Sequence, residues 1–435
     1  MRDGGRIAAA IDVLGDVTRR HQPVKSAVRD WGKRARYAGS KDRAWVSGLV
    51  LDALRRRNSL AHAMQDESPR GLVLGALAKA WGWDIRRIDA AMDEPHAPSA
   101  LTLEERERLV QAPDVEAAAH VLGDFPDWLS PHMDRVFGEA MMIETQAMAQ
   151  RASVDLRINT LKADADRVAA PLRTAQAEPS PWLLNAVHIP APDPTRRDTS
   201  LDRIPAYSKG WVEVQDAGSQ IAAAAANARA GEQVLDYCAG GGGKTLALAA
   251  AMGGKGQVFA YDIDGRRLSA LVPRLKRSGA HNVQLMHPDT PDVLAPLEAA
   301  MDCVFVDAPC TGTGTWRRRP DTKWRVRPNA LTTRMAQQDE VLRAASAYVR
   351  PGGRLVYATC SFLMEEDEDR VADFLTGHPG FAADSTADHL CASGALTEAG
   401  CDMVRRLETP TGALRLTPHS ANTDGFFVAV LRKTG

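Results

Sequence analysis

The sequence predicts an α/β protein, in which a parallel sheet covered by helices follows an all-α domain and a small α/β subdomain. From about residue 205, short apolar runs alternate with helical stretches, which is typical of a parallel sheet. Before residue 125, alanine, leucine and arginine dominate and β-branched runs are scarce. A chain of 435 residues is also too long for one ordinary core. We therefore expect domains at 1–125, 126–204 and 205–435.

The first domain, residues 1–125, is expected to be a helical bundle. Apolar residues at helical spacing from Trp45 to Leu54 predict one helix, with Ser40 as its N-cap, and Thr102 is a candidate cap for a later helix. Residues 1–70 hold 15 Lys and Arg against 8 Asp and Glu, a net charge of +7. That surplus fits a polyanion partner, although solvated helix faces account for it equally well.

The second domain, residues 126–204, is expected to begin where Pro126 interrupts the helical pattern with an amphipathic helix after it. Residues 154–175 predict a strand, a turn and a helix. Residues 175–210 are rich in proline and lack periodicity, so we expect loops there.

The third domain contains five apolar runs that predict parallel strands, and a final run that predicts an antiparallel addition. Ligands of such sheets bind at the carboxyl ends of the strands. The predicted strands are QVLDYCA, QVFAYDID, NVQLMHPD, MDCVFVDAPC, RLVYATCS and, last, DGFFVAVLRK.

A glycine-rich turn follows the first of these strands. Its glycines permit a tight turn and close backbone approach to a ligand, but the spacing fits neither a P-loop nor GxGxxG. Asp262 ends the second strand, where a carboxylate can accept both hydroxyls of a ribose, and Asp289 ends the third, where it would contact adenine. Acids at successive strand ends fit an adenosyl ligand, although either residue could instead cap a helix or form a turn.

Two cysteines, Cys310 and Cys360, close the fourth and fifth strands. A nucleophilic cysteine must be a thiolate, and Lys244 together with the sulfonium of a methyl donor would lower its pKa. The acids at 365–369 would oppose this unless they turn outward to cap a helix. Asp307 would point into the cleft and read the edge of a cytosine. The structural alternative for either cysteine is a small buried apolar residue.

The other features limit the remaining classes of function. Six dispersed cysteines without zinc spacing predict no metal site and no disulfide framework, so we expect a reducing cytoplasm. No apolar run approaches a membrane span, no signal sequence is evident, and nothing demands more than a monomer. Trp316 and Trp324 stand among arginines, where they would either stack on single-stranded nucleic acid or cover a sheet edge.

Together these motifs resemble those of the bacterial RNA cytosine-C5 methyltransferases, most of all the 16S ribosomal RNA branch. The resemblance covers nearly the whole chain. It implies a Rossmann-like S-adenosylmethionine-dependent domain preceded by an all-α NusB-like RNA-binding domain and a small α/β subdomain. The segments that carry it are GSKDRAWVSGLVLDALRRR, FPDWL, LRINTLK, VQDAGSQ, CAGGGGKT, DAPCTGTG, YATCS and DGFFVAVLRK.

The resemblance also implies a role for each site residue. Cys360 would add to C6 of cytosine, Cys310 would assist release from the methylated base, and Asp307 would face the cytosine. The family usually has Ala-Pro-Gly-Gly-Lys in the turn, so the glycine in place of proline loosens it here. The implied S-adenosylmethionine site consists of Cys238, Ala239, Gly240, Gly241, Gly242, Gly243, Lys244, Asp262, Asp289 and Asp307.

We therefore expect an RNA cytosine-C5 methyltransferase that acts on ribosomal RNA or on a ribosomal precursor particle. One alternative is a noncatalytic RNA-binding assembly factor with a vestigial cofactor pocket; the altered glycine turn favours it and the two thiols argue against it. Another is an exocyclic-amine methyltransferase, but such sites typically have Asn/Asp-Pro-Pro-aromatic where this chain has Asp307-Ala308-Pro309-Cys310.

Overall fold

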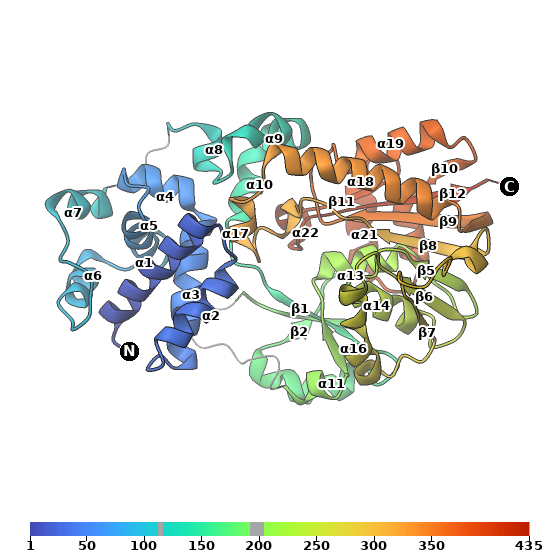
Figure 1. Cartoon of the computed structure of the whole chain (residues 1–435), viewed down its shortest axis with the longest axis horizontal. Helices are drawn as coiled ribbons and strands as arrows, with labels where there is room; N and C mark the ends of the chain where they lie inside the picture. Colours follow the sequence, from blue (N-terminus) through green and yellow to red (C-terminus); the bar gives the residue numbers. More distant parts are fainter. Residues whose placement is uncertain (112–115, 192–203, 435) are drawn as a thin grey trace. The chain divides into compact units, whose positions relative to one another are not determined.

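The computed structural model describes residues 1–111, 116–191 and 204–434 (Figure 1). Contacts divide the chain into two compact units, which we name the helical unit and the sheet unit. Part of the expected loop-rich stretch, residues 192–203, lies outside the described residues, and the boundaries at 125 and 204 remain predictions. Among the described residues, the helical unit holds Met1–Arg151 and Thr315–Val326, and the sheet unit holds Ala152–Ala191, 204–314 and 327–434.

The helical unit is a bundle of short helices, as its alanine- and leucine-rich sequence predicts. A π-helical turn, Ala76–Ala80, continues α5. The helices are α1 (Asp3–Arg20), α2 (Val24–Arg34), α3 (Ser40–Arg55), α4 (Arg57–Met64), α5 (Pro69–Gly75), α6 (Ile85–Met92), α7 (Leu103–Val110), α8 (Ala119–Leu122), α9 (Ser130–Phe137), α10 (Met141–Met148) and α17 (Pro320–Lys323).

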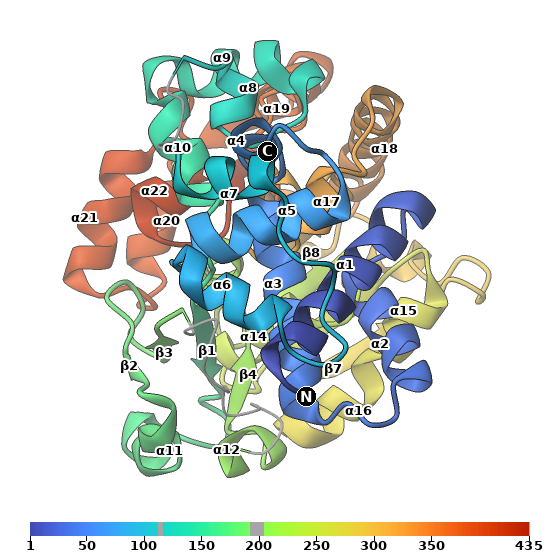
Figure 2. The same cartoon turned by 90° about the vertical axis from the view of Figure 1, so that its left-hand side faces the viewer.

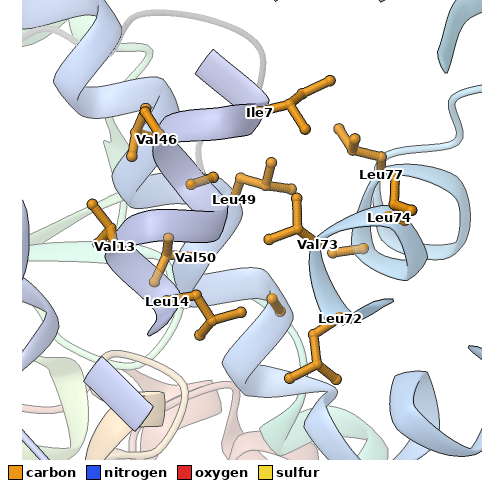
Figure 3. Close-up of a cluster of buried hydrophobic side chains, with 14 of the residues drawn as sticks. Ile7, Val13, Leu14, Val46, Leu49, Val50, Leu72, Val73, Leu74 and Leu77 are labelled. Atoms are coloured by element: carbon orange, nitrogen blue, oxygen red, sulfur yellow. The ribbon is translucent and has the colours of Figure 1, made fainter. Parts of the chain in front are cut away.

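The core of the helical unit lies between α1, α3 and α5, whose aliphatic side chains point toward one another (Figure 3). Burial of this apolar surface is the main stabilising contribution to such a bundle. The labelled core residues are Ile7, Val13, Leu14, Val46, Leu49, Val50, Leu72, Val73, Leu74 and Leu77.

The caps of two helices test the sequence predictions directly. Thr102 caps α7 as predicted, because its hydroxyl accepts a hydrogen bond from the Glu105 N–H. The prediction of Ser40 as the N-cap of α3 is wrong: the cap is Gly39, and Ser40 is the first helical residue. The Asp42 carboxylate accepts from the Gly39 N–H at 3.1 Å, as the third helical residue does in a capping box.

The segment Thr315–Val326 belongs to the helical unit although it follows a strand of the sheet unit in the chain. The Arg55 guanidinium donates to the Arg317 carbonyl at 2.7 and 3.0 Å, and the Trp324 indole donates to the Leu54 carbonyl at 2.6 Å. Trp316 is 1% exposed. Trp316 is therefore buried and not available to stack on a base, and it belongs to the helical unit.

The sheet unit is built on a mixed sheet in the order β10-β12-β9-β8-β5-β6-β7, with β11 paired to β12. Strands β5 to β9 run parallel and β12 joins β9 antiparallel, which confirms the predicted arrangement. Strands β10 and β11 were not predicted. The strands are β5 (Gln233–Asp236), β6 (Gln257–Tyr261), β7 (Val283–Met286), β8 (Met301–Asp307), β9 (Val349–Thr359), β10 (Phe381–Asp384), β11 (Leu414–Leu416) and β12 (Phe426–Lys433).

Helices cover both faces of this sheet (Figures 1 and 2). The helices α18 (Pro328–Ser346) and α19 (Glu368–Gly377) pack on one face, and those on the other face include α13 (Ala217–Ala224) and α14 (Gly243–Ala251). The sheet is therefore buried on both sides, as expected for parallel strands. Further helices are α15 (Gly265–Ser269), α16 (Leu271–Ser278), α20 (Thr386–Ala392), α21 (Glu398–Leu407) and α22 (Pro418–Ala421).

A smaller antiparallel sheet in the order β2-β3-β1-β4 begins the sheet unit. β1 and α11 confirm the strand and helix predicted over 154–175. Leu156 and Ile158 of β1 pack against Val168 and Leu172 of the helix. The elements are β1 (Val154–Ile158), α11 (Ala165–Leu172), β2 (Glu178–Pro179), β3 (Ala186–Ile189), α12 (Pro205–Ser208) and β4 (Val212–Val214).

The strand order of the main sheet reverses between β5 and β8. From β5 the chain proceeds through β6 and β7 toward one edge, and then returns to place β8 on the other side of β5. A crevice outside the carboxyl ends of the strands is expected at such a reversal. The glycine turn after β5 and Asp307 at the end of β8 both lie at this point.

Candidate active site

The glycine turn connects β5 to α14, and its backbone requires glycine at defined positions. Gly240 and Gly242 have φ of 52° and 79°, in the left-handed region. A Cβ on Gly242 would lie 2.1 Å from Leu271 Cδ1, whereas the nearest atom to a Cβ on Gly241 would be Arg274 Nη1 at 3.7 Å. Gly242 caps α14 without a side-chain hydrogen bond, so the first N–H groups of the helix are left for a ligand.

Asp262 lies directly after β6 and is buried beside this turn. Its carboxylate accepts hydrogen bonds from the Gly240 N–H and the Asp264 N–H, both at 2.8 Å. These bonds fix the carboxylate at the strand end, where an acceptor for ribose hydroxyls was predicted. Each carboxylate oxygen retains a further lone pair for such a bond.

Asp289 lies farther along the same edge of the sheet, past the end of β7, and is exposed. With Ile263 and His287 it lines an open hollow next to Asp262. Ile263 is 85% exposed, so the hollow presents an apolar side chain beside polar groups, as an adenine ring would require. The roles of Asp262 and Asp289 toward a cofactor remain predictions.

Asp236, at the end of β5, is a buried acid that the sequence prediction of the site omitted. Its Oδ2 accepts from the Thr245 hydroxyl at 2.6 Å, and its Oδ1 is buried without a hydrogen-bond partner. Burial, with a smaller contribution from the Asp307 charge, raises the pKa of Asp236 to about 7. The available signal was an acid at a strand end immediately before a glycine turn.

Lys244 and Asp307 form an ion pair across the strand reversal. The Lys244 ammonium donates to Asp307 Oδ2 at 2.7 Å. Burial alone would lower the pKa of Lys244, but the charge of Asp307, its hydrogen bond and the negative charge available at Cys360 raise it overall. Lys244 is therefore charged.

The sequence-predicted cysteines meet at the carboxyl ends of β8 and β9. The Cys310 and Cys360 sulfur atoms lie 3.4 Å apart. The hydrogen bond with Cys360, reinforced by burial, raises the pKa of the Cys310 thiol well above its usual value. The Cys310 thiol therefore stays protonated.

Two acids after Cys360 turn inward, contrary to the arrangement that we expected to protect a thiolate. Glu366 and Asp367 are fully buried. Glu366 accepts hydrogen bonds from the N–H and hydroxyl of Thr311, and Asp367 accepts from the Thr359 hydroxyl at 2.6 Å. Burial raises the pKa of both carboxyls. The hydrogen bonds that these acids accept offset the free-energy cost of burying them, so the acids need not turn outward.

The remaining predicted residues of the turn support its shape. Ala239 and Gly240 are buried, and Cys238 is partly buried beside them. Burial and the nearby Asp236 charge raise the pKa of Cys238 well above its usual value, so this thiol stays neutral. The left-handed glycines, the uncapped end of α14 and the unpaired oxygen of Asp236 all lie at the end of β5, and we name them the cofactor cradle, because these donors and this acceptor suit an adenosyl cofactor with an amino-acid tail.

The described part of the chain contains neither a candidate metal site nor a candidate membrane-spanning helix. No group of three or more His, Cys, Asp or Glu residues is placed to hold a metal ion within residues 1–111, 116–191 and 204–434. In the same ranges, no helix combines the length and the apolar character needed to cross a membrane.

Comparison with known proteins identifies relatives along most of the chain. A family model, 16S rRNA methyltransferase RsmB/F, matches residues 223–432. The probable ribosomal RNA small subunit methyltransferase B of Synechocystis sp. is 32% identical over 318 residues, which are 71% of this chain and 67% of the relative. The ribosomal RNA small subunit methyltransferase B of Yersinia pseudotuberculosis is 32% identical over 311 residues, 71% of this chain and 66% of the relative.

Solved structures share the fold. The crystal structure of PH0851 aligns with 100% of this chain and 99% of its own, with a TM-score of 0.72 and 23% identity. A methyltransferase homolog protein from Pyrococcus horikoshii aligns with 72% of this chain and 97% of its own, with a TM-score of 0.57 and 26% identity. The predicted fold class is confirmed, and the chain belongs to the 16S rRNA methyltransferase RsmB/F family, whose methyl donor is S-adenosylmethionine.

Proposed function

We propose that this protein methylates C5 of a cytosine in 16S ribosomal RNA through a transient bond between Cys360 and C6 of the base. The observation that carries the proposal is the 3.4 Å approach of the Cys310 and Cys360 sulfurs at the ends of adjacent parallel strands. Two thiols at the mouth of a nucleotide-type site suit covalent catalysis followed by release.

Cys360 acts as the nucleophile in this proposal. Its thiolate adds to C6, and the electrons of the C5–C6 double bond then make C5 nucleophilic. Bound S-adenosylmethionine supplies an electrophilic methyl group on a sulfonium. After C5 has gained the methyl carbon, transfer of the C5 proton to solvent re-forms the double bond as the Cys360 thiolate leaves. Lys244 supports the charge on this sulfur.

Cys310 serves the release of the enzyme from the methylated base. Its raised pKa keeps it protonated while Cys360 attacks, which supports this division of roles. Asp307, at the end of β8, holds the edge of the cytosine and stabilises the charge that accumulates on the ring. Its ion pair with Lys244 fixes the carboxylate in place.

The residues of the cofactor cradle hold S-adenosylmethionine in this proposal. The glycine turn from Cys238 to Lys244 approaches the cofactor backbone, and Asp262 accepts its ribose hydroxyls. Asp289 and Ile263 border the hollow proposed for the adenine. These residues bind and orient the cofactor.

An exposed face of the helical unit, which we name the basic face, holds the RNA backbone in this proposal. Tyr37 is 74% exposed next to a hollow between α1 and α2. The buried Asp16 carboxylate lies 3.2 Å from Arg34 Nη2 and anchors that side chain at the surface. Exposed cations and an aromatic ring suit phosphate contact and base stacking. The exposed cations of this face are Arg19, Arg20, Lys25, Arg29, Lys33, Arg34, Arg36, Lys41 and Arg43.

Incubation of unmethylated 16S ribosomal RNA with labelled S-adenosylmethionine tests this function, followed by mapping of the modified nucleotide. The proposal expects label at C5 of a cytosine. Label on an exocyclic amine, or binding of RNA without any transfer, contradicts it. The same mapping in ribosomal RNA from cells with and without the protein identifies the target nucleotide.

A further inference from the structure

Two consecutive buried acids, Glu366 and Asp367, bond to residues next to the two active-site cysteines. Glu366 accepts two hydrogen bonds from Thr311, the residue after Cys310, and also has a hydrogen bond with Ser361, the residue after Cys360. Asp367 accepts from Thr359, the residue before Cys360. Both side chains come from the turn that leads into α19, so one short segment contacts the neighbours of both cysteines.

Glu366 holds the backbone on both sides of Cys310. Its Oε1 accepts from the Thr311 N–H at 2.8 Å, and its Oε2 accepts from the Thr311 hydroxyl. The Gln338 amide of α18 donates both to Glu366 Oε1 at 3.1 Å and to the Pro309 carbonyl at 2.9 Å. Cys310 is thus fixed between two anchored neighbours.

Asp367 holds the backbone on both sides of Cys360 in a similar way. Its Oδ1 accepts from the Thr359 hydroxyl at 2.6 Å, and that hydroxyl accepts from the Ser361 N–H at 3.1 Å. Arg415 lies 3.3 Å from Asp367 Oδ2 and balances its charge. The residues before and after Cys360 are therefore tied together by the Thr359 hydroxyl, which Asp367 holds in place.

Both oxygens of each acid act as acceptors in these contacts. Thr311 presents two donors to Glu366, and Thr359 and Arg415 both present donors to Asp367. An amide of the same shape has one acceptor oxygen and one NH2 donor, so it must lose one of these bonds or reverse it with a threonine hydroxyl, which can also accept. Either substitution therefore disturbs the contacts next to a cysteine.

We propose that Glu366 and Asp367 are positioning residues with separate tasks: Glu366 sets Cys310 for release of the methylated base, and Asp367 sets Cys360 for attack. The inference rests on the proposed function, because it assigns each acid to one step of that reaction. It predicts opposite effects from two neighbouring isosteric substitutions.

The test compares Glu366→Gln with Asp367→Asn in the full-length protein, using unmethylated 16S ribosomal RNA and labelled S-adenosylmethionine. Single-turnover methyl transfer measures attack, and the protein–RNA adduct that survives denaturing electrophoresis measures failed release. Glu366→Gln should transfer the first methyl within about 3-fold of the wild-type rate, yet slow multiple turnover about 10- to 100-fold and accumulate adduct. Asp367→Asn should slow the first transfer by about 10- to 100-fold without accumulating adduct.

Each variant serves as the control for the other, because both replace one buried carboxyl by an amide in the same turn. If both substitutions slow the first transfer equally and neither accumulates adduct, the division of tasks is overturned. Thr311→Val removes the hydroxyl that donates to Glu366, so this variant should also accumulate adduct. It keeps the test valid if the Glu366→Gln protein does not fold. The Cys310→Ala protein is the reference: absence of its adduct contradicts the proposed function itself rather than the roles of the acids.

Discussion

The Lys244 ammonium and the Asp307 carboxylate lie 2.7 Å apart, one from the first turn of α14 and the other from the end of β8. Strands β5 and β8 are neighbours in space but are separated in sequence by β6 and β7. The ion pair therefore joins the proposed cofactor turn to the proposed cytosine site. It also sets a positive charge near Cys360, which belongs to the next strand.

Replacement of Asp307 tests the proposed role of this carboxylate at the base. Asp307→Asn keeps the size of the side chain but removes its charge, so stabilisation of the reacting cytosine is lost. We expect kcat to fall about 10²- to 10⁴-fold, the range typical of positioned acids and bases. Steady-state kinetics with saturating RNA and S-adenosylmethionine measures this change.

Asp302→Asn provides a matched control, because Asp302 lies at the opposite end of β8 and bonds to Gln233 and Arg350. It should lower stability slightly and leave kcat within about 2-fold, as expected for a residue distant from the reaction. Equal losses of kcat in the two variants would show that Asp307 affects catalysis only by stabilising β8, and not by contact with the cytosine.

Alanine substitutions in the glycine turn should differ sharply between adjacent positions. At Gly242, the φ of 79° and the overlap with Leu271 make an alanine strained, whereas Gly241 has room for a methyl group. Gly242→Ala should reduce the free energy of unfolding by about 1–3 kcal/mol and weaken S-adenosylmethionine binding. Gly241→Ala should change neither by more than about 0.5 kcal/mol.

Urea denaturation and calorimetric titration with S-adenosylmethionine measure both quantities. A Gly242→Ala protein with unchanged stability and affinity would show that the left-handed conformation of the turn is unimportant.

The buried carboxyl of Asp236 should make stability depend on pH. Its pKa is raised to about 7 in the folded protein, above the ordinary value near 4 that it regains on unfolding. Between these values the folded state binds more protons, so this residue makes the free energy of unfolding fall as the pH rises from about 4 to 7, by a few kcal/mol at most, and then level off.

Asp236→Asn removes the titration while its amide oxygen still accepts from Thr245. Urea unfolding of both proteins at several pH values between about 5 and 8 should give a stability difference that grows in favour of the variant as the pH rises. A difference that is independent of pH, or that grows in the other direction, would contradict the raised pKa.

Substitutions in the basic face should weaken RNA binding without affecting the cofactor. Tyr37→Ala removes an exposed ring that stacks on a base in the proposal, and loss of about 1–3 kcal/mol corresponds to roughly 5- to 150-fold weaker binding. Arg34→Ala should also weaken binding, with a smaller salt dependence than the wild type. Fluorescence anisotropy with labelled ribosomal RNA fragments at several salt concentrations measures both effects.

Arg86→Ala is the control, because it removes one exposed positive charge from α6 of the same unit. Its affinity should stay close to that of the wild type. If Arg86→Ala weakens RNA binding as much as Arg34→Ala does, the basic face contributes to RNA binding only through the net charge of the protein.

Local sequence patterns predicted the main sheet well, because buried parallel strands are continuous apolar runs and their polar ends gather at one edge. This is why Asp307, Cys310 and Cys360 were singled out from the sequence. The placement of Thr315–Val326 in the helical unit was not predictable in the same way, since it depends on contacts of Arg55 and Leu54 that are remote in the chain.

The inward orientation of Glu366 was also beyond sequence reasoning. A run of acids normally indicates a solvated surface, and the donors of Thr311, Gln338 and Ser361 make burial of this carboxyl tolerable. The same holds for Ser40, which has the residue type of a cap but lies one position inside the helix that Gly39 and Asp42 begin.

Single-turnover methyl transfer by the Cys360→Ala protein tests the central claim most directly. The experiment uses saturating S-adenosylmethionine and unmethylated 16S ribosomal RNA, with cofactor binding measured in parallel to confirm an intact fold. We expect normal cofactor affinity, no transfer above background and no protein–RNA adduct. Methyl transfer at the wild-type rate by this variant would contradict covalent catalysis through Cys360.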